Sequence, residues 1–289
     1  VWAVPVRVGT VAFFYNKEMF KKAGVDGDAI KTWDDFLGAV QKIKDAGMVP
    51  LGCDGADKWP LHFYYSYLVM RNGGEAALAA VKAKEPNAFM ADAFIKTGEQ
   101  LNQLGAMDVC QPGWEGSHWP SEMGELGDGR VAMALSFEDT QRRQKQSSTS
   151  GEGIGDENVG RFVFPVVEGG KGDAGATFGG LNGWAVSKNA PPETIDFLKF
   201  YTSVDNQRLL ARETGIIPVV KGADDAIATQ FVRDAAVQLS DSDYHQNYLD
   251  QDLGPNLGRT VNDVSVELWA GRMTPEEASQ TRQDTADLE

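Results

Sequence analysis

The chain contains few residues that bind metals or carry thiol chemistry: two cysteines and three histidines among 289 residues. Cys53 and Cys110 form no C-x-x-C pair, and His62, His118 and His245 are too scattered for a zinc triad. We therefore expect no metal and no cofactor. Two buried thiols packed as small hydrophobic side chains are the expected state of the cysteines. A disulfide between them is the alternative, which the sequence alone cannot decide.

Positive charge is also scarce. The chain has 27 Lys and Arg against 42 Asp and Glu, which gives a formal net charge of −15. Nucleic acids and anionic membrane surfaces bind to cationic faces, so the sequence argues against both as partners. No apolar run approaches the about 18 consecutive residues of a membrane-spanning helix. A hydrophobic content of 42% is typical of a globular protein, and 289 residues allow one large domain or two ordinary ones.

Catalytic motifs are missing as well. The chain has no G-x-S-x-G elbow, no H-E-x-x-H motif and no Walker loop. Gly151, Gly153 and Gly155 imitate a phosphate-binding loop, but they have acidic neighbours and no preceding strand. The aspartates of 241–252 lack the spacing and the glycine of a calcium loop, and indicate a solvated acidic face. We expect no catalytic residue.

Strand and helix patterns alternate along the chain, which favours an α/β fold. A β-rich apolar run at 11–15 precedes a helix over 17–23, which Gly24 closes. Thr32 begins a second helix as its N-cap, and 274–277 is a clear helix start. Further helices are predicted over 62–71, 76–83, 87–104 and 191–201, and further strands over 49–51, 131–136, 161–165 and 184–187, with 216–220 as an edge strand or crossing segment because of Pro218.

Aromatic residues stand in polar loops near several expected strand ends. Trp59 lies in a polar turn, Trp119 lies in the stretch 111–121, and Phe137 precedes two acids. Such a ring can stack on the C–H face of a sugar, while neighbouring carboxylates and amides bind its hydroxyls. The alternative is that these rings cover the core. The paired glycines of 178–184 allow the close approach of a ligand or of another chain segment.

Segments along the whole chain resemble, in the same order, segments of one protein family. The matching segments are VPVR at 4–7 with VAFFYNK at 11–17, KTWDDF at 31–36, GDGRVAM at 127–133, FGGLNGWAVSK at 178–188 and GIIPV at 215–219. Each match is weakly specific alone, and the five together are strong. The sequence is similar to the extracytoplasmic solute-binding proteins of carbohydrate ABC importers, the relatives of maltose-binding protein.

The resemblance implies a two-lobed, periplasmic-binding-protein-like fold of type II. An oligosaccharide would lie in the cleft between the lobes, which close over it by a hinge motion. The closed, monomeric protein would deliver the sugar to ABC permease subunits without catalysing a reaction. Its place would be extracytoplasmic, either in the periplasm or at the cell surface as a lipoprotein, with the signal segment outside this chain.

The same resemblance implies a division of the chain. Residues 1–8 are the hinge-crossing strand from the first lobe, 9–176 and 215–289 form a nearly complete second lobe, and 177–214 belongs to a first lobe that is mostly missing. The strand of 177–214 would then lack its partners and expose its apolar side chains. The side chains expected at this surface are Trp184, Val186, Ile195, Leu198 and Tyr201.

Carried over position by position, the resemblance implies a set of ligand-binding residues. Arg7 could donate a forked pair of hydrogen bonds to adjacent hydroxyls, and Asp250 could accept two from a vicinal diol. For Arg7 the alternative is a surface ion pair of little energetic weight. The set comprises Arg7, Trp59, Phe137, Glu138, Gly179, Gly180, Asn182, Asp250 and Gln251.

Other functions stay open at this point. A binding protein for a polyol or for glycerol phosphate would share the fold. A carbohydrate-active hydrolase would show a similar aromatic cleft and would need two carboxylates across it. A structural or adhesion protein would show neither lobe closure nor saturable sugar binding.

Overall fold

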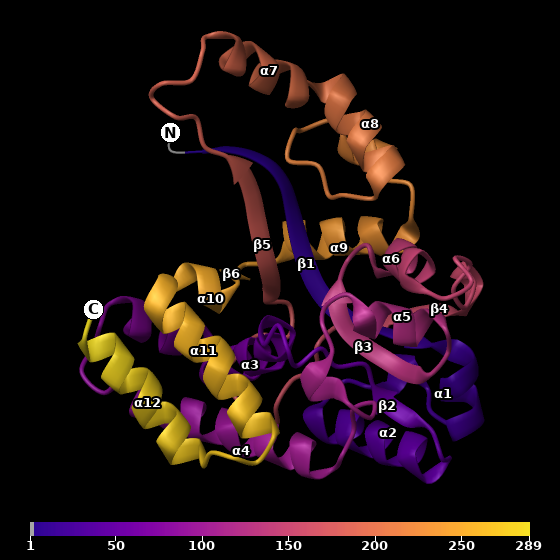
Figure 1. Cartoon of the computed structure of the whole chain (residues 1–289), viewed down its shortest axis with the longest axis vertical. Coiled ribbons are helices and arrows are strands. Elements are labelled where there is room, and N and C mark those ends of the chain that lie inside the picture. Colours follow the sequence, from indigo (N-terminus) through magenta and orange to yellow (C-terminus); the bar gives the residue numbers. More distant parts are fainter. Residues whose placement is uncertain (1–2) are drawn as a thin grey trace.

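One long strand organises the fold. The computed structural model describes residues 3–289, and in it β1 (Val4–Asn16) runs from the upper part of the molecule into the lower part (Figure 1). Its apolar residues from Val11 to Tyr15 are all buried. A continuous apolar run of this kind is typical of a strand that is covered on both faces. The prediction of a strand at 11–15 is confirmed.

The strands form one mixed sheet in the order β2-β3-β1-β5-β6, with β4 also paired to β1. The second half of β1 pairs antiparallel with β3 on one side and β4 on the other. The first half pairs antiparallel with β5, from Val4 opposite Trp184 to Thr10 opposite Gly179. The remaining strands are β2 (Val49–Leu51), β3 (Val131–Phe137), β4 (Val159–Phe162), β5 (Thr177–Trp184) and β6 (His245–Asn247).

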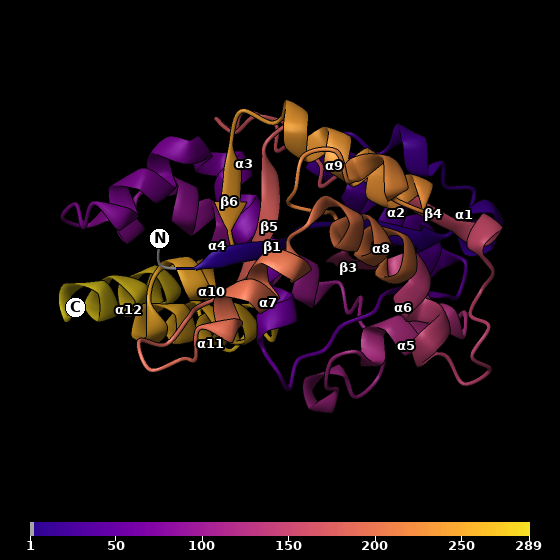
Figure 2. The ribbon, with the colours of Figure 1, turned by 90° about the horizontal axis from the view of Figure 1, so that it is seen from above.

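Helices pack around the lower part of this sheet, and α8 lies beside the upper part of β1 (Figures 1 and 2). The helix α3 is buried along most of its first half, and aromatic rings such as Phe13, Tyr67 and Phe164 form the core around it. The helices are α1 (Lys17–Ala23), α2 (Trp33–Asp45), α3 (Trp59–Lys82), α4 (Asp92–Ala106), α5 (Ser121–Gly127), α6 (Thr140–Ser147), α7 (Glu193–Tyr201), α8 (Val204–Thr214), α9 (Gln230–Asp241), α10 (Leu249–Asp252), α11 (Pro255–Trp269) and α12 (Pro275–Asp287).

Local sequence signals set several of these ends. Gly24 closes α1 at φ 66°, the left-handed conformation that glycine adopts without strain. Thr32 and Thr274 each form a capping box with the acid three residues on. These three predictions are confirmed, as are the strands at 49–51 and 131–136 and a helix within 191–201.

Two element predictions were wrong in their bounds. The strand expected at 184–187 is β5, which lies earlier in the sequence. Its residues 179–184 pair with β1, and this pairing ends where Trp184 lies opposite Val4. The strand expected at 161–165 is β4, which begins and ends earlier because its register is set by β1. The two helices expected at 62–71 and 76–83 are confirmed as the two helical segments of α3, which a kink at Gly74 (φ 65°, ψ −171°) separates. The segment at 216–220 makes a single bridge, between Ile217 and Val8.

Residues 181–209 carry most of the exposed large apolar side chains. Trp184 is 50% exposed, and Val186 and Ile195 are also exposed, as predicted. The prediction of an unpartnered strand was wrong, because β1 pairs along β5. Leu198 is buried, because α7 packs against α8. The division into lobes at 8, 176 and 214 stays a prediction.

Candidate functional site

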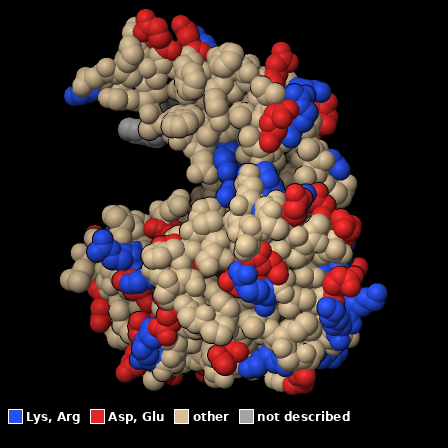
Figure 3. All heavy atoms as spheres, turned by 45° about the vertical axis from the view of Figure 1, so that its right-hand side comes forward, with Lys and Arg blue, Asp and Glu red and all other residues tan. Residues whose placement is uncertain are grey.

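A pocket of about 340 Å³ lies where the two halves of β1 meet. The molecule is deeply notched between its upper and lower parts, and basic side chains lie at the inner end of the notch (Figure 3). The pocket draws side chains from β1, β5, the start of α3, the loop before α5, the end of β3, α6, and the segment 248–251 around α10. Its lining residues are Arg7, Trp59, His62, Phe63, Trp119, Phe137, Arg143, Asn182, Tyr248, Asp250 and Gln251.

Aromatic rings dominate one wall of this pocket. The ring of Trp59 lies 5.7 Å from that of Trp119 and 5.8 Å from that of Phe137, measured between centroids. Phe63 stacks on Tyr248 with centroids 5.4 Å apart. Rings at these separations support one another and form a rigid apolar surface. The pocket can therefore hold a flat apolar face, such as the C–H face of a sugar ring.

Arg143 holds part of this wall in place. Its guanidinium lies 5.1 Å from the centroid of Trp119 and 5.6 Å from that of Phe137, within range of cation–π attraction. Its Nε donates to a carboxylate oxygen of Asp139 at 2.6 Å, and Arg142 bonds the other oxygen. The positive charge of Arg143 is therefore already paired with a carboxylate.

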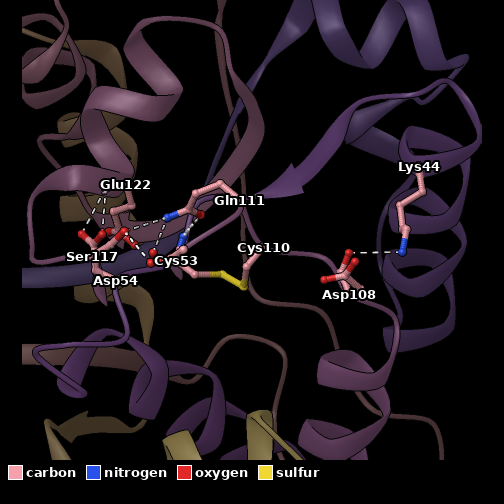
Figure 4. The surroundings of a disulfide bond; sticks show 9 residues. Lys44, Cys53, Asp54, Asp108, Cys110, Gln111, Ser117 and Glu122 are labelled. Atoms are coloured by element: carbon pink, nitrogen blue, oxygen red, sulfur yellow. Dashed lines mark hydrogen bonds between the residues drawn. A yellow bond between two sulfur atoms is a disulfide. The ribbon is translucent and has the colours of Figure 1, made fainter. Parts of the chain in front are cut away.

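A disulfide connects the loop that leads to Trp59 with the loop that carries Trp119. Cys53 and Cys110 are bonded to each other, which shows that the expectation of two buried thiols was wrong (Figure 4). Hydrogen bonds reinforce the link, because the side-chain amide of Gln111 accepts from the Cys53 backbone N–H and donates to its carbonyl. The carboxylate of Asp57 accepts from the Trp119 backbone N–H at 2.7 Å. These contacts fix Trp119 against the loop that leads to Trp59.

Two buried carboxyl groups lie at the same junction (Figure 4). Asp54 accepts from the backbone N–H of Glu122, and both side chains are shielded from water. Burial favours the neutral acids, and the charge of Asp57 near Asp54 and that of Asp54 near Glu122 act in the same direction. The pKa of Asp54 rises to about 7, chiefly because of burial, and that of Glu122 rises well above its ordinary value for the same reason.

Glu138 lies behind the pocket wall. Its carboxylate accepts from the Thr10 backbone N–H at 3.0 Å and from Arg7 Nη2 at 3.4 Å, and the side chain is fully buried. Burial raises the pKa of Glu138 to about 7, against the lowering effect of Arg7. Glu138 is therefore not one of the lining residues and acts on the pocket through Arg7.

The paired glycines also lie outside the lining. A Cβ on Gly179 would come 1.9 Å from the carbonyl oxygen of Gly9, and a Cβ on Gly180 would come 2.1 Å from the ring of Tyr248. Their lack of a side chain therefore permits the pairing of β5 with β1 and the placement of Tyr248. Of the residues predicted from the sequence, the pocket brings together Arg7, Trp59, Phe137, Asn182, Asp250 and Gln251.

Five lining residues were outside the predicted ligand-binding set: His62, Phe63, Trp119, Arg143 and Tyr248. Trp119 carried a signal, as an aromatic residue in a polar loop. His62 and Phe63 belong to an apolar helical stretch that reads as core, and Arg143 to a polar helix that reads as solvated surface. Tyr248 reaches the pocket because β6 joins β5, a contact between distant parts of the sequence.

His62 and Asp250 meet at the floor of the pocket. The ring nitrogen Nδ1 of His62 lies 2.6 Å from the carbonyl oxygen of Trp59, and Nε2 lies 3.7 Å from Asp250 Oδ1. Burial lowers the pKa of His62, while the charge of Asp250 opposes this effect. Asp250 Oδ2 accepts from the side-chain amide of Asn262 at 3.1 Å.

The fold and this aromatic, polar-edged pocket define a solute-binding protein of the α/β, cleft-containing class. The chain belongs to the bacterial extracellular solute-binding protein family, whose model matches residues 1–238. Its architecture is that of solved solute-binding proteins. A chitin oligosaccharide binding protein aligns with a TM-score of 0.87 at 23% identity, covering 100% of this chain and 71% of its own. The protein RafE in complex with raffinose aligns with a TM-score of 0.78 at 20% identity, covering 100% and 73%.

Curated relatives extend the comparison. A multiple sugar-binding protein of Streptococcus mutans is 25% identical over 227 residues, which cover 77% of this chain and 52% of the relative. The sn-glycerol-3-phosphate-binding periplasmic protein UgpB of Escherichia coli is 23% identical over 298 aligned positions, covering 96% and 64%. The chain thus spans between about half and two thirds of the length of these two proteins.

Within residues 3–289, no group of three or more His, Cys, Asp or Glu side chains is placed to hold a metal ion. Within the same residues no helix is long and apolar enough to cross a membrane.

Proposed function

We propose that this protein binds a neutral sugar or oligosaccharide in the pocket between Arg7 and Asp250 and delivers it to an ABC permease. The observation that carries the proposal is the convergence of five aromatic rings on one pocket that also has polar groups at its edge. Sugar rings have apolar C–H faces and hydroxyl rims, and this arrangement complements both. The curated multiple sugar-binding relative supports the same ligand class.

The polar edge supplies both donors and acceptors. Arg7 and Asn182 come from adjacent positions on β1 and β5, since the two residues are partners in the strand register. Asp250 and Gln251 approach from α10. A hydroxyl both donates and accepts, so a rim that combines guanidinium, amide and carboxylate groups suits a polyhydroxylated ligand.

Charge favours a neutral ligand over an anionic one. Arg7 is paired with Glu138, and Arg143 is paired with Asp139. A phosphate would have to compete with these carboxylates for its cations. Glycerol phosphate is nevertheless the second candidate, because the alignment with UgpB covers 96% of the chain.

The same lining disfavours a hydrolase. Asp250 is the one carboxylate among the residues that line the pocket within positions 3–289. Glycoside hydrolysis by the usual routes requires two carboxyl groups across the scissile bond. We therefore assign the protein to ligand capture without catalysis, with two lobes divided near residues 8, 176 and 214 that close over the sugar. We place it in the periplasm or at the cell surface, as a monomer in its free form.

A thermal-shift screen tests the ligand class. The panel contains neutral oligosaccharides of different linkages, their monosaccharides and sn-glycerol 3-phosphate, since a ligand that binds the folded state raises Tm by mass action. A saturable rise with a neutral saccharide and none with the phosphate supports the proposal. A rise with the phosphate alone supports the second candidate, and product formation in the same samples would identify an enzyme instead.

A further inference from the structure

The hydrogen bond of His62 to Trp59 fixes where its neutral imidazole carries hydrogen. A carbonyl oxygen only accepts, so Nδ1, at 2.6 Å from it, must be the protonated nitrogen. In the neutral ring Nε2 is then a bare acceptor. It faces Asp250 Oδ1 at 3.7 Å, and neither atom has another hydrogen-bond partner in the described part of the chain.

Two buried acceptors that face each other lack a donor between them, which costs free energy. A proton on Nε2 would satisfy both, because the imidazolium could then donate to the carboxylate. A hydroxyl of a bound ligand would have to meet the same carboxylate at Oδ2, because Oδ1 is buried. The Asp250 side chain remains 18% exposed in the pocket, and Oδ2, which accepts from Asn262, has a further lone pair for such a hydroxyl.

We propose that His62 is a positioning residue that controls the sugar-binding carboxylate of Asp250 through a single proton. When His62 is neutral, Asp250 is free to accept hydrogen bonds from the hydroxyls of the ligand. When His62 is protonated, the imidazolium donates to Oδ1 and offsets the charge of the carboxylate, so Oδ2 becomes a weaker acceptor for the ligand. Sugar binding and proton binding therefore oppose each other at this pair. The inference rests on the proposed function and adds a regulator to the same site.

The surroundings of His62 set the direction of this effect. Burial lowers the pKa of His62, with Asp250 as the main charge that raises it. The other charged groups of the pocket are Arg7 on β1, Arg143 on α6 and, behind Arg7, the buried Glu138. His62 is thus neutral at neutral pH and gains its proton on acidification, so sugar affinity should fall as the pH falls.

Histidine NMR tests the geometry without any ligand. With three histidines in the chain, H62Q assigns the signal by its disappearance. The expected result is an Nδ1–H tautomer for His62 at neutral pH and a titration that moves to lower pH in D250N, where the carboxylate charge is removed. An Nε2–H tautomer, or a titration unchanged in D250N, would overturn the proposal.

Proton linkage tests the control of binding. Calorimetry with the best saccharide from the screen, in buffers of different ionisation enthalpy, should show proton release as the pH falls through the titration of His62. The dissociation constant should rise by up to about tenfold per pH unit, the limit for one proton. H62Q should lose this part of the pH dependence. The control H245Q removes a partly buried histidine outside the pocket and should retain it.

The outcomes distinguish a failure of the proposed function from a failure of the role of His62 alone. If no solute binds at any pH, the proposed function fails. If a saccharide binds with the same pH dependence in the wild type and in H62Q, the role of His62 fails alone. E138Q identifies the share of the pH dependence that belongs to Glu138, because burial raises the pKa of that side chain to about 7.

Discussion

The buried carboxyl group of Glu138 predicts how stability depends on pH. Its pKa is raised from 4.5 to about 7 in the folded protein because burial disfavours the charged form. Between these two values the folded state holds a proton that the unfolded state has lost. By linkage, the free energy of unfolding then falls as the pH rises, by up to about 1.4 kcal/mol per pH unit for this group.

The substitution E138Q isolates this contribution. Glutamine keeps the carbonyl oxygen that accepts from Thr10 and removes the titration. From about pH 5 to about pH 8, the wild type should lose about 2 kcal/mol more unfolding free energy than E138Q. The comparison of slopes is needed because Asp54 and Glu122, whose pKa values are also raised, contribute the same trend in both proteins.

Urea unfolding at a series of pH values, followed by circular dichroism, gives the two slopes. E99Q serves as the control, because Glu99 is an exposed glutamate on α4 and should behave as the wild type does. If E138Q and the wild type lose the same free energy between the two pH values, Glu138 does not titrate in the way that its burial requires.

Three further predictions concern stability. Replacing Cys53 and Cys110 by serine should lower the unfolding free energy by about 4 kcal/mol, from the entropy of closing a loop across 57 residues; an unchanged urea midpoint would contradict the disulfide. G179A should destabilise by about 1–3 kcal/mol or more, because its Cβ would meet the backbone of β1, whereas G38A, with open space around it, should be neutral or stabilising in the same assay. T274A should cost about 1 kcal/mol through loss of the cap of α12, and an unaltered Tm would refute that role.

Much of the fold could be predicted because its signals are local. The glycine that closes α1 and the threonines that cap α2 and α12 act within one helical turn, and each is visible as a short motif. The bounds of β5 could not be predicted in this way. Its residues 179–183 are mainly glycine, and their pairing depends on β1, which lies far away in the sequence.

The residues of the candidate site differ in the same way, because some carry a local signal and others depend on contacts between distant segments. Trp59 and Phe137 could be identified because an aromatic residue in a polar loop is unusual without a ligand or a core to cover. Glu138 was expected at the ligand, yet its side chain turns inward to Arg7 and Thr10. His62 lies in an apolar helix, and only the three-dimensional contact with Asp250 distinguishes it from a core histidine.

The central claim is that the aromatic pocket binds sugar, and isothermal titration calorimetry tests it most directly. The best saccharide is titrated into the wild type, into W59A and into W184A, which removes an equally large ring from an exposed position outside the pocket. We predict saturable binding by the wild type and W184A, and at least tenfold weaker binding by W59A, which corresponds to about 1.4 kcal/mol. Equal affinity of W59A and the wild type would contradict the assignment of the site.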